Sequence, residues 1–320
     1  MILNPEILTI LLLDAVFAFF GIIAFVLSLK IALYWDNDAT TQRQYQLVKQ
    51  SYLGAVIIKY ILAIKIPLIL FFIFTLDQLS NVLNGAMCAA GVVNATSYGS
   101  QLLVLKIFNL YLFMYWLYLH QADIAQETQP YTKKKFLLFV VIFFPFMAEI
   151  VLEYMMFFAL DPNALVDCCG VIYSFGSESY FSYLMNSLGN RFFVRMFYIN
   201  FFLIVIAYVF RRAILFSLLQ IFFLILAITT LITFFGTYIY ELPTHHCPFC
   251  LLQKEYYYIG YVLYIFLFLG TFNGIAVGFV PSSKEVQEKY YKRSLFFLSL
   301  YILIVSFYVL HYYYLNGVWL

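Results

Sequence analysis

Apolar residues fill most of the chain in long runs, and short polar stretches separate these runs. About 20 consecutive apolar residues are enough for a helix to cross the hydrocarbon core of a bilayer. Because lipid offers the backbone no hydrogen bonds, such runs form helices. Eight runs reach this length, at residues 7–29, 54–76, 102–121, 136–159, 192–210, 213–239, 256–280 and 294–315. The sequence therefore predicts an all-α, polytopic integral membrane bundle of eight transmembrane helices.

The connections between the apolar runs do not indicate a second domain. The fifth and sixth runs are separated only by Arg211 and Arg212, which predicts a tight helical hairpin. The polar stretch 36–53 is expected to form a short cytoplasmic helix. No internal repeat or low-complexity linker divides the chain, so residues 1–320 are predicted to form a single transmembrane bundle domain.

The composition agrees with a protein whose main partner is the lipid bilayer. Hydrophobic residues make up 65% of the chain and charged residues 11%, whereas a soluble domain carries about 25% charged residues. The net charge is only +2, and the basic residues form short clusters beside the apolar runs. A nucleic-acid partner is therefore not expected.

The positions of lysine and arginine predict the orientation, because cytoplasmic loops retain positive charge during insertion. One set of loops holds Lys30, Arg43, Lys49, Lys133, Lys134, Lys135, Arg211, Arg212, Lys284, Lys289, Lys292 and Arg293, and the other holds only Arg191, Arg195 and Lys254. Both termini are thus expected on the exoplasmic side, together with loops 77–101, 160–191 and 240–255. The expected location is a bacterial inner (cytoplasmic) membrane.

All five cysteines fall in these three exoplasmic loops. Cys88 lies in the first, Cys168 and Cys169 are adjacent in the second, and Cys247 and Cys250 form a Cys-x-x-Cys pair in the third. The outer face of such a membrane is oxidising, so thiols there tend to be disulfide-bonded, metal-bound or catalytically cycled. We therefore expect the three loops to share one site.

One hypothesis is thiol–disulfide redox chemistry. Cys247 and Cys250 would be catalytic and would exchange electrons with Cys168 and Cys169 or with an exoplasmic thiol protein. A membrane quinone would accept or supply the electron pair.

A second hypothesis is a soft-metal site for zinc or copper. His245 and His246 directly precede the Cys-x-x-Cys pair, and imidazole nitrogens and thiolates are the ligands that these metals prefer. The ligands would be Cys88, His245, His246, Cys247 and Cys250, with His311 as a further candidate. A third reading is a permease-like subunit whose disulfides are only structural. The sequence contains no phosphate-binding glycine loop and no Ser/His/Asp order of the kind that indicates hydrolysis. Whether the protein is an enzyme stays open.

Several ionisable residues lie inside the apolar runs, where each needs a partner or a wet cavity. Glu149 and Glu153 are four residues apart and share one helix face. Lys106 and Asp14 lie at comparable depths in their own runs. These four residues predict a buried network that relays protons or escorts a cation, or in which Lys106 merely allows a glutamate to be buried. Lys65 is assigned only to the carbonyl that Pro67 leaves without a donor.

Overall fold

The computed structural model describes residues 4–36, 41–161, 166 and 189–320, and within these residues the regular structure is helical, with no strand. Eight helical segments there are long and apolar enough to cross a membrane. They are α1 (Pro5–Tyr34), α2 (Gln42–Ser80), α4 (Gly99–Ile124), α5 (Thr132–Ala159), α7 (Asn190–Val209), α8 (Ala213–Thr230) with its continuation to Tyr240, α10 (Ile259–Phe279) and α11 (Lys284–Asn316). The predicted all-α membrane fold is confirmed.

Two of these helices extend well beyond the apolar runs. The helix α2 begins at Gln42, so residues 42–53 are helical as expected. They do not form a separate short helix but are the first turns of the membrane-spanning helix itself. The helix α11 likewise starts at Lys284, before its apolar run. In both cases a hydroxyl caps the first turn: Thr41 Oγ1 accepts from Gln44 N, and Ser283 Oγ accepts from Val286 N. Because the caps precede the polar segments, the helices begin there.

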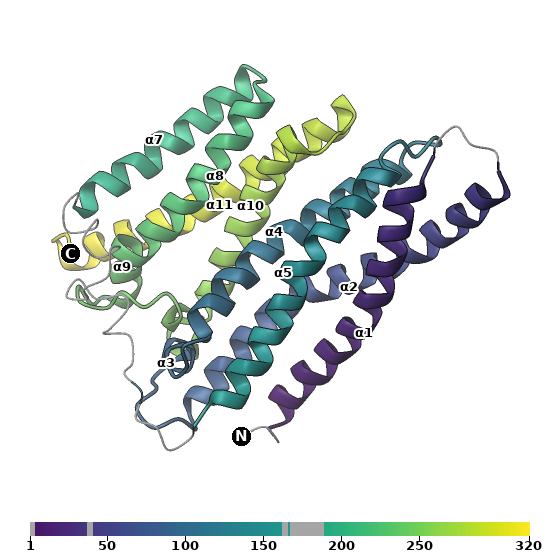
Figure 1. Ribbon diagram of the computed structural model, residues 1–320. Coiled ribbons are helices and arrows are strands. Elements are labelled where there is room, and N and C mark those ends of the chain that lie inside the picture. The colour runs from purple at the N-terminus through teal and green to yellow at the C-terminus, as the bar shows by residue number, and fades with distance from the viewer. Residues whose placement is uncertain (1–3, 37–40, 162–165, 167–188) are drawn as a thin grey trace. The chain divides into compact units, whose positions relative to one another are not determined.

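The chain divides into two compact units. The first comprises residues 1–84 and 92–164, and the second comprises residues 85–91 and 165–320. In the first unit, α1 packs against α2 and α5, and α4 packs against α2 and α5 (Figure 1). Aliphatic residues and large aromatic rings share the buried core of this unit, and the rings include Phe17, Phe113, Trp116, Phe139 and Phe146. The single bundle domain over the whole chain stays a prediction.

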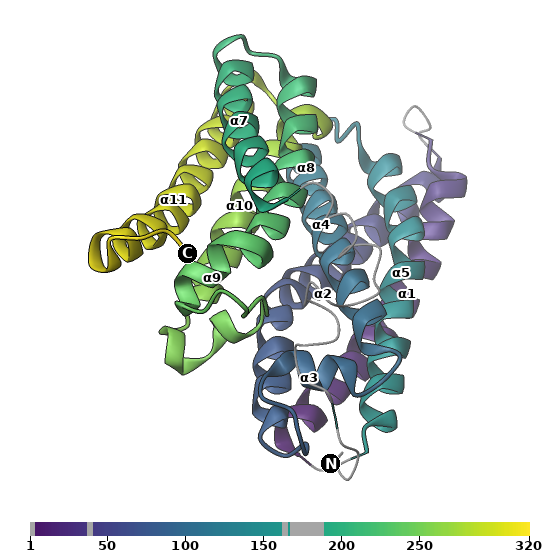
Figure 2. The ribbon, with the colours of Figure 1, turned by 90° about the vertical axis from the view of Figure 1, so that its left-hand side faces the viewer.

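In the second unit, α10 packs against α8 and α11, and α7 packs against α8 (Figure 2). The turn from α7 to α8 is as tight as predicted, and Arg211 in it has a φ of 53°. Glycine allows the close approach of α10 to α11, because a Cβ on Gly270 would lie 2.5 Å from Leu298 Cδ2. Side chains also bond across this unit, since Gln220 Nε2 donates to Ser294 Oγ at 3.1 Å.

Short elements connect the long helices of the second unit. The helix α8 runs into a π-helical turn, η1 (Leu231–Phe235), and then into α9 (Gly236–Tyr240). Two 3-10 turns, η2 (Cys250–Leu252) and η3 (Lys254–Tyr256), precede α10. The short helix α3 (Ala89–Asn94) follows Cys88 in the connection from α2 to α4, and its residues 89–91 belong to the second unit while 92–94 belong to the first. The cysteines described below therefore lie in the connections between long helices and not inside them.

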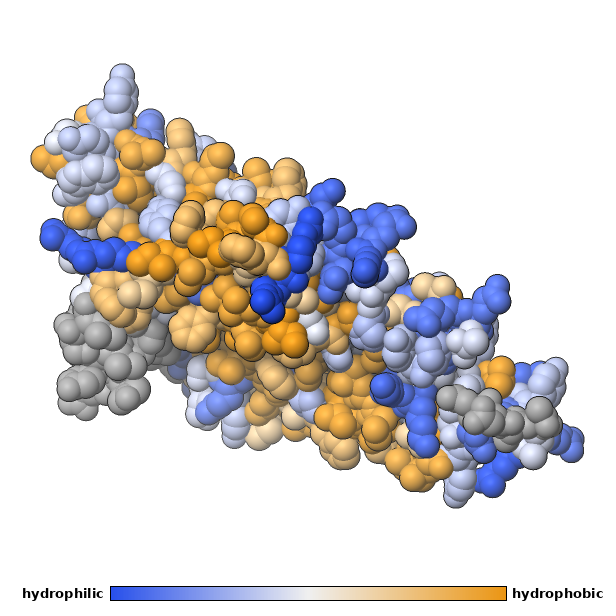
Figure 3. Space-filling model, turned by 90° about the horizontal axis from the view of Figure 1, so that it is seen from above, coloured by the Kyte–Doolittle hydropathy of each residue, from blue (hydrophilic) through white to orange (hydrophobic). Residues whose placement is uncertain are grey.

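Large apolar side chains are exposed along the helices of both units. Leu12 is 59% exposed, Phe144 63% and Phe202 64%. Apolar residues cover much of the face shown in Figure 3. Such a surface is stable only against hydrocarbon, so the chain is a multi-pass membrane protein in contact with the lipid bilayer. The exoplasmic position of both termini and the bacterial inner membrane stay predictions.

The close packing of α10 on α11 generates a test. Replacing Gly270 with valine should destabilise the folded protein by about 1–3 kcal/mol, because the added atoms overlap Leu298. Thermal unfolding in detergent measures the effect. The control is Val262→Ile on α10, because this side chain is 39% exposed and an added methylene there should cost little. Equal melting temperatures for the two variants would contradict the packing described here.

Candidate functional site

Three cysteine sulfurs come together in the second unit. Cys88 Sγ lies 3.5 Å from Cys247 Sγ. With Cys250 Sγ, all three sulfurs lie within 4.8 Å of one another. The residues are buried, and no disulfide bond joins them to one another. We call Cys88, Cys247 and Cys250 the cysteine cluster. The residues come from two segments that are far apart in the sequence, so the fold itself creates the cluster.

Backbone constraints hold Cys88 in place. Gly85 has a φ of +90°, a conformation that favours glycine, and a Cβ there would lie 2.5 Å from Val166 O. Two residues after Gly85, the carbonyl oxygen of Met87 accepts a hydrogen bond from Gln253 Nε2 at 2.9 Å. The segment 85–91 is therefore tied to the connection between α9 and α10, which carries the other two cysteines.

Tyrosines fix the Cys-x-x-Cys segment. The Tyr240 hydroxyl, at the end of α9, donates to Cys247 O, and the Tyr264 hydroxyl, on α10, donates to Pro248 O at 2.7 Å. Gly260 brings the start of α10 against η2, because a Cβ there would lie 2.9 Å from Leu251 O. With its carbonyls held by helix side chains, the segment presents Cys247 and Cys250 in a defined position.

The two histidines lie beside the cysteine cluster but are not part of the group of atoms within 4.8 Å. His246 Nδ1 is 3.1 Å from Ile232 O, in the π-helical turn. If this carbonyl accepts the ring proton, the lone pair is on Nε2. The His245 ring packs edge-on against Tyr240, and its Nε2 is buried with no hydrogen-bond partner among the residues that the structure describes.

Burial sets the charge of both imidazoles. It lowers the pKa of His245, an effect that Cys88 partly opposes, and it lowers the pKa of His246 against the opposing hydrogen bond to Ile232 O. Neutral imidazoles can act as metal ligands, but they supply no positive charge to stabilise a thiolate. Cys168 and Cys169 lie outside the described residues, as does most of loop 160–191, so their predicted place in the site stays a prediction.

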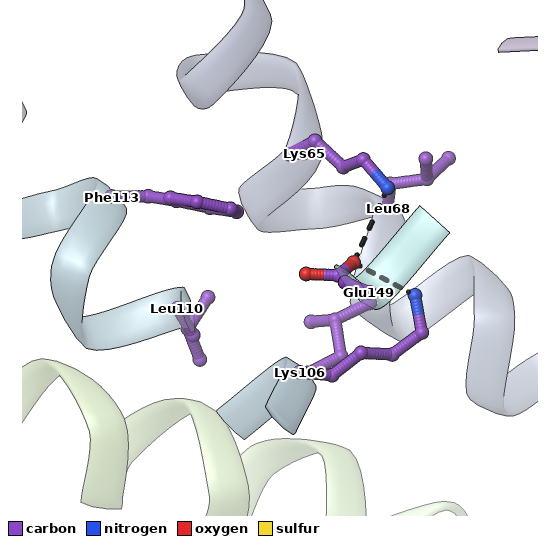
Figure 4. Close-up of a pocket in the computed structure, with 7 residues that line it drawn as sticks. Lys65, Leu68, Lys106, Leu110, Phe113 and Glu149 are labelled. Atoms are coloured by element: carbon purple, nitrogen blue, oxygen red, sulfur yellow. Dashed lines mark hydrogen bonds and ion pairs between the residues drawn. The ribbon is translucent and has the colours of Figure 1, made fainter. Parts of the chain in front are cut away.

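The first unit contains a second polar assembly, which we call the ion cluster: Asp14, Lys65, Lys106, Glu149 and Glu153. Lys65 Nζ lies 2.6 Å from Asp14 Oδ1 and 3.2 Å from Glu149 Oε1. Lys106 Nζ lies 3.0 Å from Glu149 Oε1 and 2.7 Å from Glu153 Oε2. Glu149 thus lies between the two ammonium groups, as Figure 4 shows. The structure brings together all four residues of the network expected from the sequence.

An amide completes the surroundings of Glu149. Asn109 Nδ2 donates to Glu149 Oε2 at 2.6 Å and to Pro145 O at 3.0 Å. Because Asn109 is three residues after Lys106, both side chains reach the same acid from one face of α4. The carboxylate of Glu149 is therefore bonded on both oxygens.

Lys65 is the member of the ion cluster that the sequence analysis did not include. The sequence predicts only that Lys65 bonds a backbone carbonyl near Pro67, whereas the structure pairs it with Asp14 and Glu149. A signal was present, because three acids buried with Lys106 alone would leave a large uncompensated charge. Lys65 is near the middle of its apolar run, at a depth where it can supply the missing positive charge.

A separate buried ion pair fixes the connection from α4 to α5. Lys135 Nζ lies 2.6 Å from Asp123 Oδ2, which also accepts from Thr132 Oγ1 at 2.9 Å. Asp123 Oδ1 accepts from Tyr131 N at 2.7 Å. The charge pattern of the sequence places Lys135 in a loop and predicts no partner for it. Its carboxylate partner closes the turn between the two helices, which is a structural role.

Together these features define the class of the protein: a multi-pass helical membrane protein with a buried cluster of three cysteines. The chain matches no protein-family model, no curated protein sequence and no solved structure. The functional argument therefore depends on the geometry of the chain itself.

The pairing of Lys65 generates a prediction about stability. Lys65→Met removes the ammonium group that lies against Asp14 and leaves a buried carboxylate without compensation, so unfolding should become easier by about 3–5 kcal/mol. The measurement is denaturant or thermal unfolding in detergent. Lys59→Met is the matched control, because Lys59 is on the same helix but exposed, and its loss should change little. A similar loss for both variants would show that the ion pair is not the cause.

Proposed function

We propose that the protein binds a soft or borderline metal ion, copper(I) or zinc, through Cys88, Cys247 and Cys250. The convergence of three buried sulfurs from two separate segments carries this proposal. Zinc–thiolate bonds are about 2.3 Å long, so two thiolates on one tetrahedral ion lie about 3.8 Å apart. The 3.5 Å separation of Cys88 Sγ and Cys247 Sγ is close to this value and much longer than a disulfide bond.

Burial also supports a metal over free thiolates. Three ionised thiols this close together and away from water would repel one another strongly, whereas a bound cation compensates their charge. The hydrogen bonds from Tyr240 and Tyr264 hold the backbone beside the sulfurs, as is common around metal ligands. The cluster is thus arranged so that an ion would bind without large movement of the loop.

The histidines distinguish the two metals. Three thiolates alone suit copper(I), which accepts few, soft ligands. Zinc needs a fourth ligand, and His245 Nε2 is a candidate because it is buried beside the cluster without a hydrogen-bond partner among the described residues. Handling of such an ion at the membrane surface is the function that this site supports best.

Thiol–disulfide chemistry is the second candidate, and the 3.5 Å approach of Cys88 to Cys247 favours it. In that reaction two thiols would lose two electrons and two protons to form a disulfide, and a quinone would take both to become a quinol. The nearby Cys250 thiolate would then open the disulfide by exchange. Direct exchange with an external thiol protein is disfavoured by the burial of all three sulfurs, so we place this function second.

Metal analysis tests the first candidate. Protein purified without chelator and exposed to zinc or copper(I) should retain close to one ion per chain. Substituting Cys88, Cys247 or Cys250 with serine should weaken binding at least about 10-fold, because each removes one thiolate ligand. His311→Ala is the control, because His311 is exposed and stacks on Phe307. Full metal retention in all three cysteine variants would refute the metal site.

Thiol trapping separates the second candidate from the first. If the cluster is a metal site, a chelator should increase the rate at which an alkylating reagent labels the three cysteines, since the bound ion protects its ligands. If it is a redox site, mild reduction should instead expose Cys247 or Cys250 selectively, with no effect of the chelator. Mass spectrometry of the labelled peptides reads out both results.

A further inference from the structure

The ion cluster contains one more acid than base. Asp14 on α1, Lys65 on α2, Lys106 on α4 and the two glutamates on α5 bring three carboxyl groups against two ammonium groups. Each of these residues is at most 5% exposed. With every group ionised, the cluster would hold one uncompensated negative charge inside the bilayer. Buried charge of this kind is strongly unfavourable unless something neutralises it.

The hydrogen bonds and ion pairs together show which carboxyl group is least compensated. Glu149 is bonded on both oxygens, to two lysines and to Asn109. Glu153 bonds only through Oε2, which accepts from Lys106, an ammonium group that it shares with Glu149. Glu153 Oε1 is buried and has no hydrogen-bond partner within the described part of the chain.

Asp14 makes no hydrogen bond to a described residue through either oxygen, but its Oδ1 lies 2.6 Å from Lys65 Nζ, which is 3.2 Å from Glu149 and therefore belongs mainly to Asp14. Lys106 is divided more evenly between Glu149, at 3.0 Å, and Glu153, at 2.7 Å, so Glu153 has the smaller share of compensating charge.

Either a metal cation or a proton could neutralise this charge, and the geometry favours the proton. A metal cation needs several oxygens close together. Among the residues that the structure describes, the carboxyl oxygens of Asp14, Glu149 and Glu153 do not form a group within metal-binding distance, whereas the three cysteine sulfurs do. A proton needs one oxygen only. The unbonded Glu153 Oε1 provides that oxygen.

We propose that the ion cluster is a proton-binding site and that Glu153 carries the proton on Oε1. The carbonyl oxygen Oε2 of the neutral acid still accepts from Lys106, so the observed contact is kept. Release of the proton leaves the Glu153 carboxylate, and the proton passes to water. The site is independent of the cysteine cluster, which lies in the other unit.

A small polar cavity provides a place for such a water. It has a volume of about 10 Å³ and is lined by Lys65, Lys106 and Glu149 together with apolar side chains of α2 and α4. This is room for about one water molecule, and three charged groups are available to bond it. Lys106 lines the cavity and also donates to Glu153 Oε2. The ion cluster would therefore combine a neutral acid with a cavity that can hold one water molecule, as proton exchange requires.

Infrared difference spectroscopy tests the proposal on the full chain in lipid nanodiscs at neutral pH. A protonated carboxyl group gives a carbonyl stretching band that shifts on exchange into deuterated water. The wild type should show this band. Glu153→Gln should abolish it, and Glu153→Asp should shift its frequency. The control Glu285→Gln should leave the band unchanged, because Glu285 is 82% exposed and outside the cluster.

Melting temperature provides the second measurement. Glutamine has the shape of a neutral glutamic acid, so Glu153→Gln should fold with an unchanged melting temperature. A large fall would mean that Glu153 is ionised in the wild type and would overturn the proposal. A wild type without the deuterium-sensitive band would overturn it as well. If the melting temperature instead rises with sodium concentration while the band is absent, a metal cation neutralises the cluster.

Discussion

The low polarity of the bilayer is the constraint on which the rest of this structure depends. Hydrocarbon cannot hydrogen-bond to the backbone, so the chain crosses it as long helices, and lipid covers side chains that water would reject. Leu12, Phe144 and Phe202 are exposed for this reason. The same medium makes each buried charge expensive. Every ionised side chain inside a span must therefore find a partner on another helix.

The two units meet this constraint with different chemistry. In the first unit, charged groups from four helices surround Glu149, and their ion pairs hold the helices in register. In the second unit, the packed helices use small and uncharged groups, such as Gly270 and Gln220, while the reactive side chains lie at the helix ends. A thiol is neutral and tolerates burial, and it becomes charged when it binds a cation. Three neutral thiols can therefore be buried together without a compensating charge.

The cysteine cluster and the ion cluster have different surroundings. The cysteine cluster is built from connections that the charge pattern assigns to the exoplasmic side, where a soft metal or an oxidant is available. The ion cluster is enclosed by the helices α1, α2, α4 and α5 and has contact with one small cavity. The proposed metal binding at the cysteine cluster and the proposed proton exchange at the ion cluster would therefore be two separate reactions of one membrane protein.

The sequence alone determined the helical membrane fold, because a run of apolar residues has no other stable form in lipid. It also identified Asp14, Lys106, Glu149 and Glu153, since charges stand out against an apolar background. Tertiary structure decided the partners. Lys65 joined the ion cluster through contacts between helices that no local pattern encodes. Cys88 lies 159 positions from Cys247 in the chain, and only folding shows that their sulfurs are neighbours while the two histidines lie outside the group.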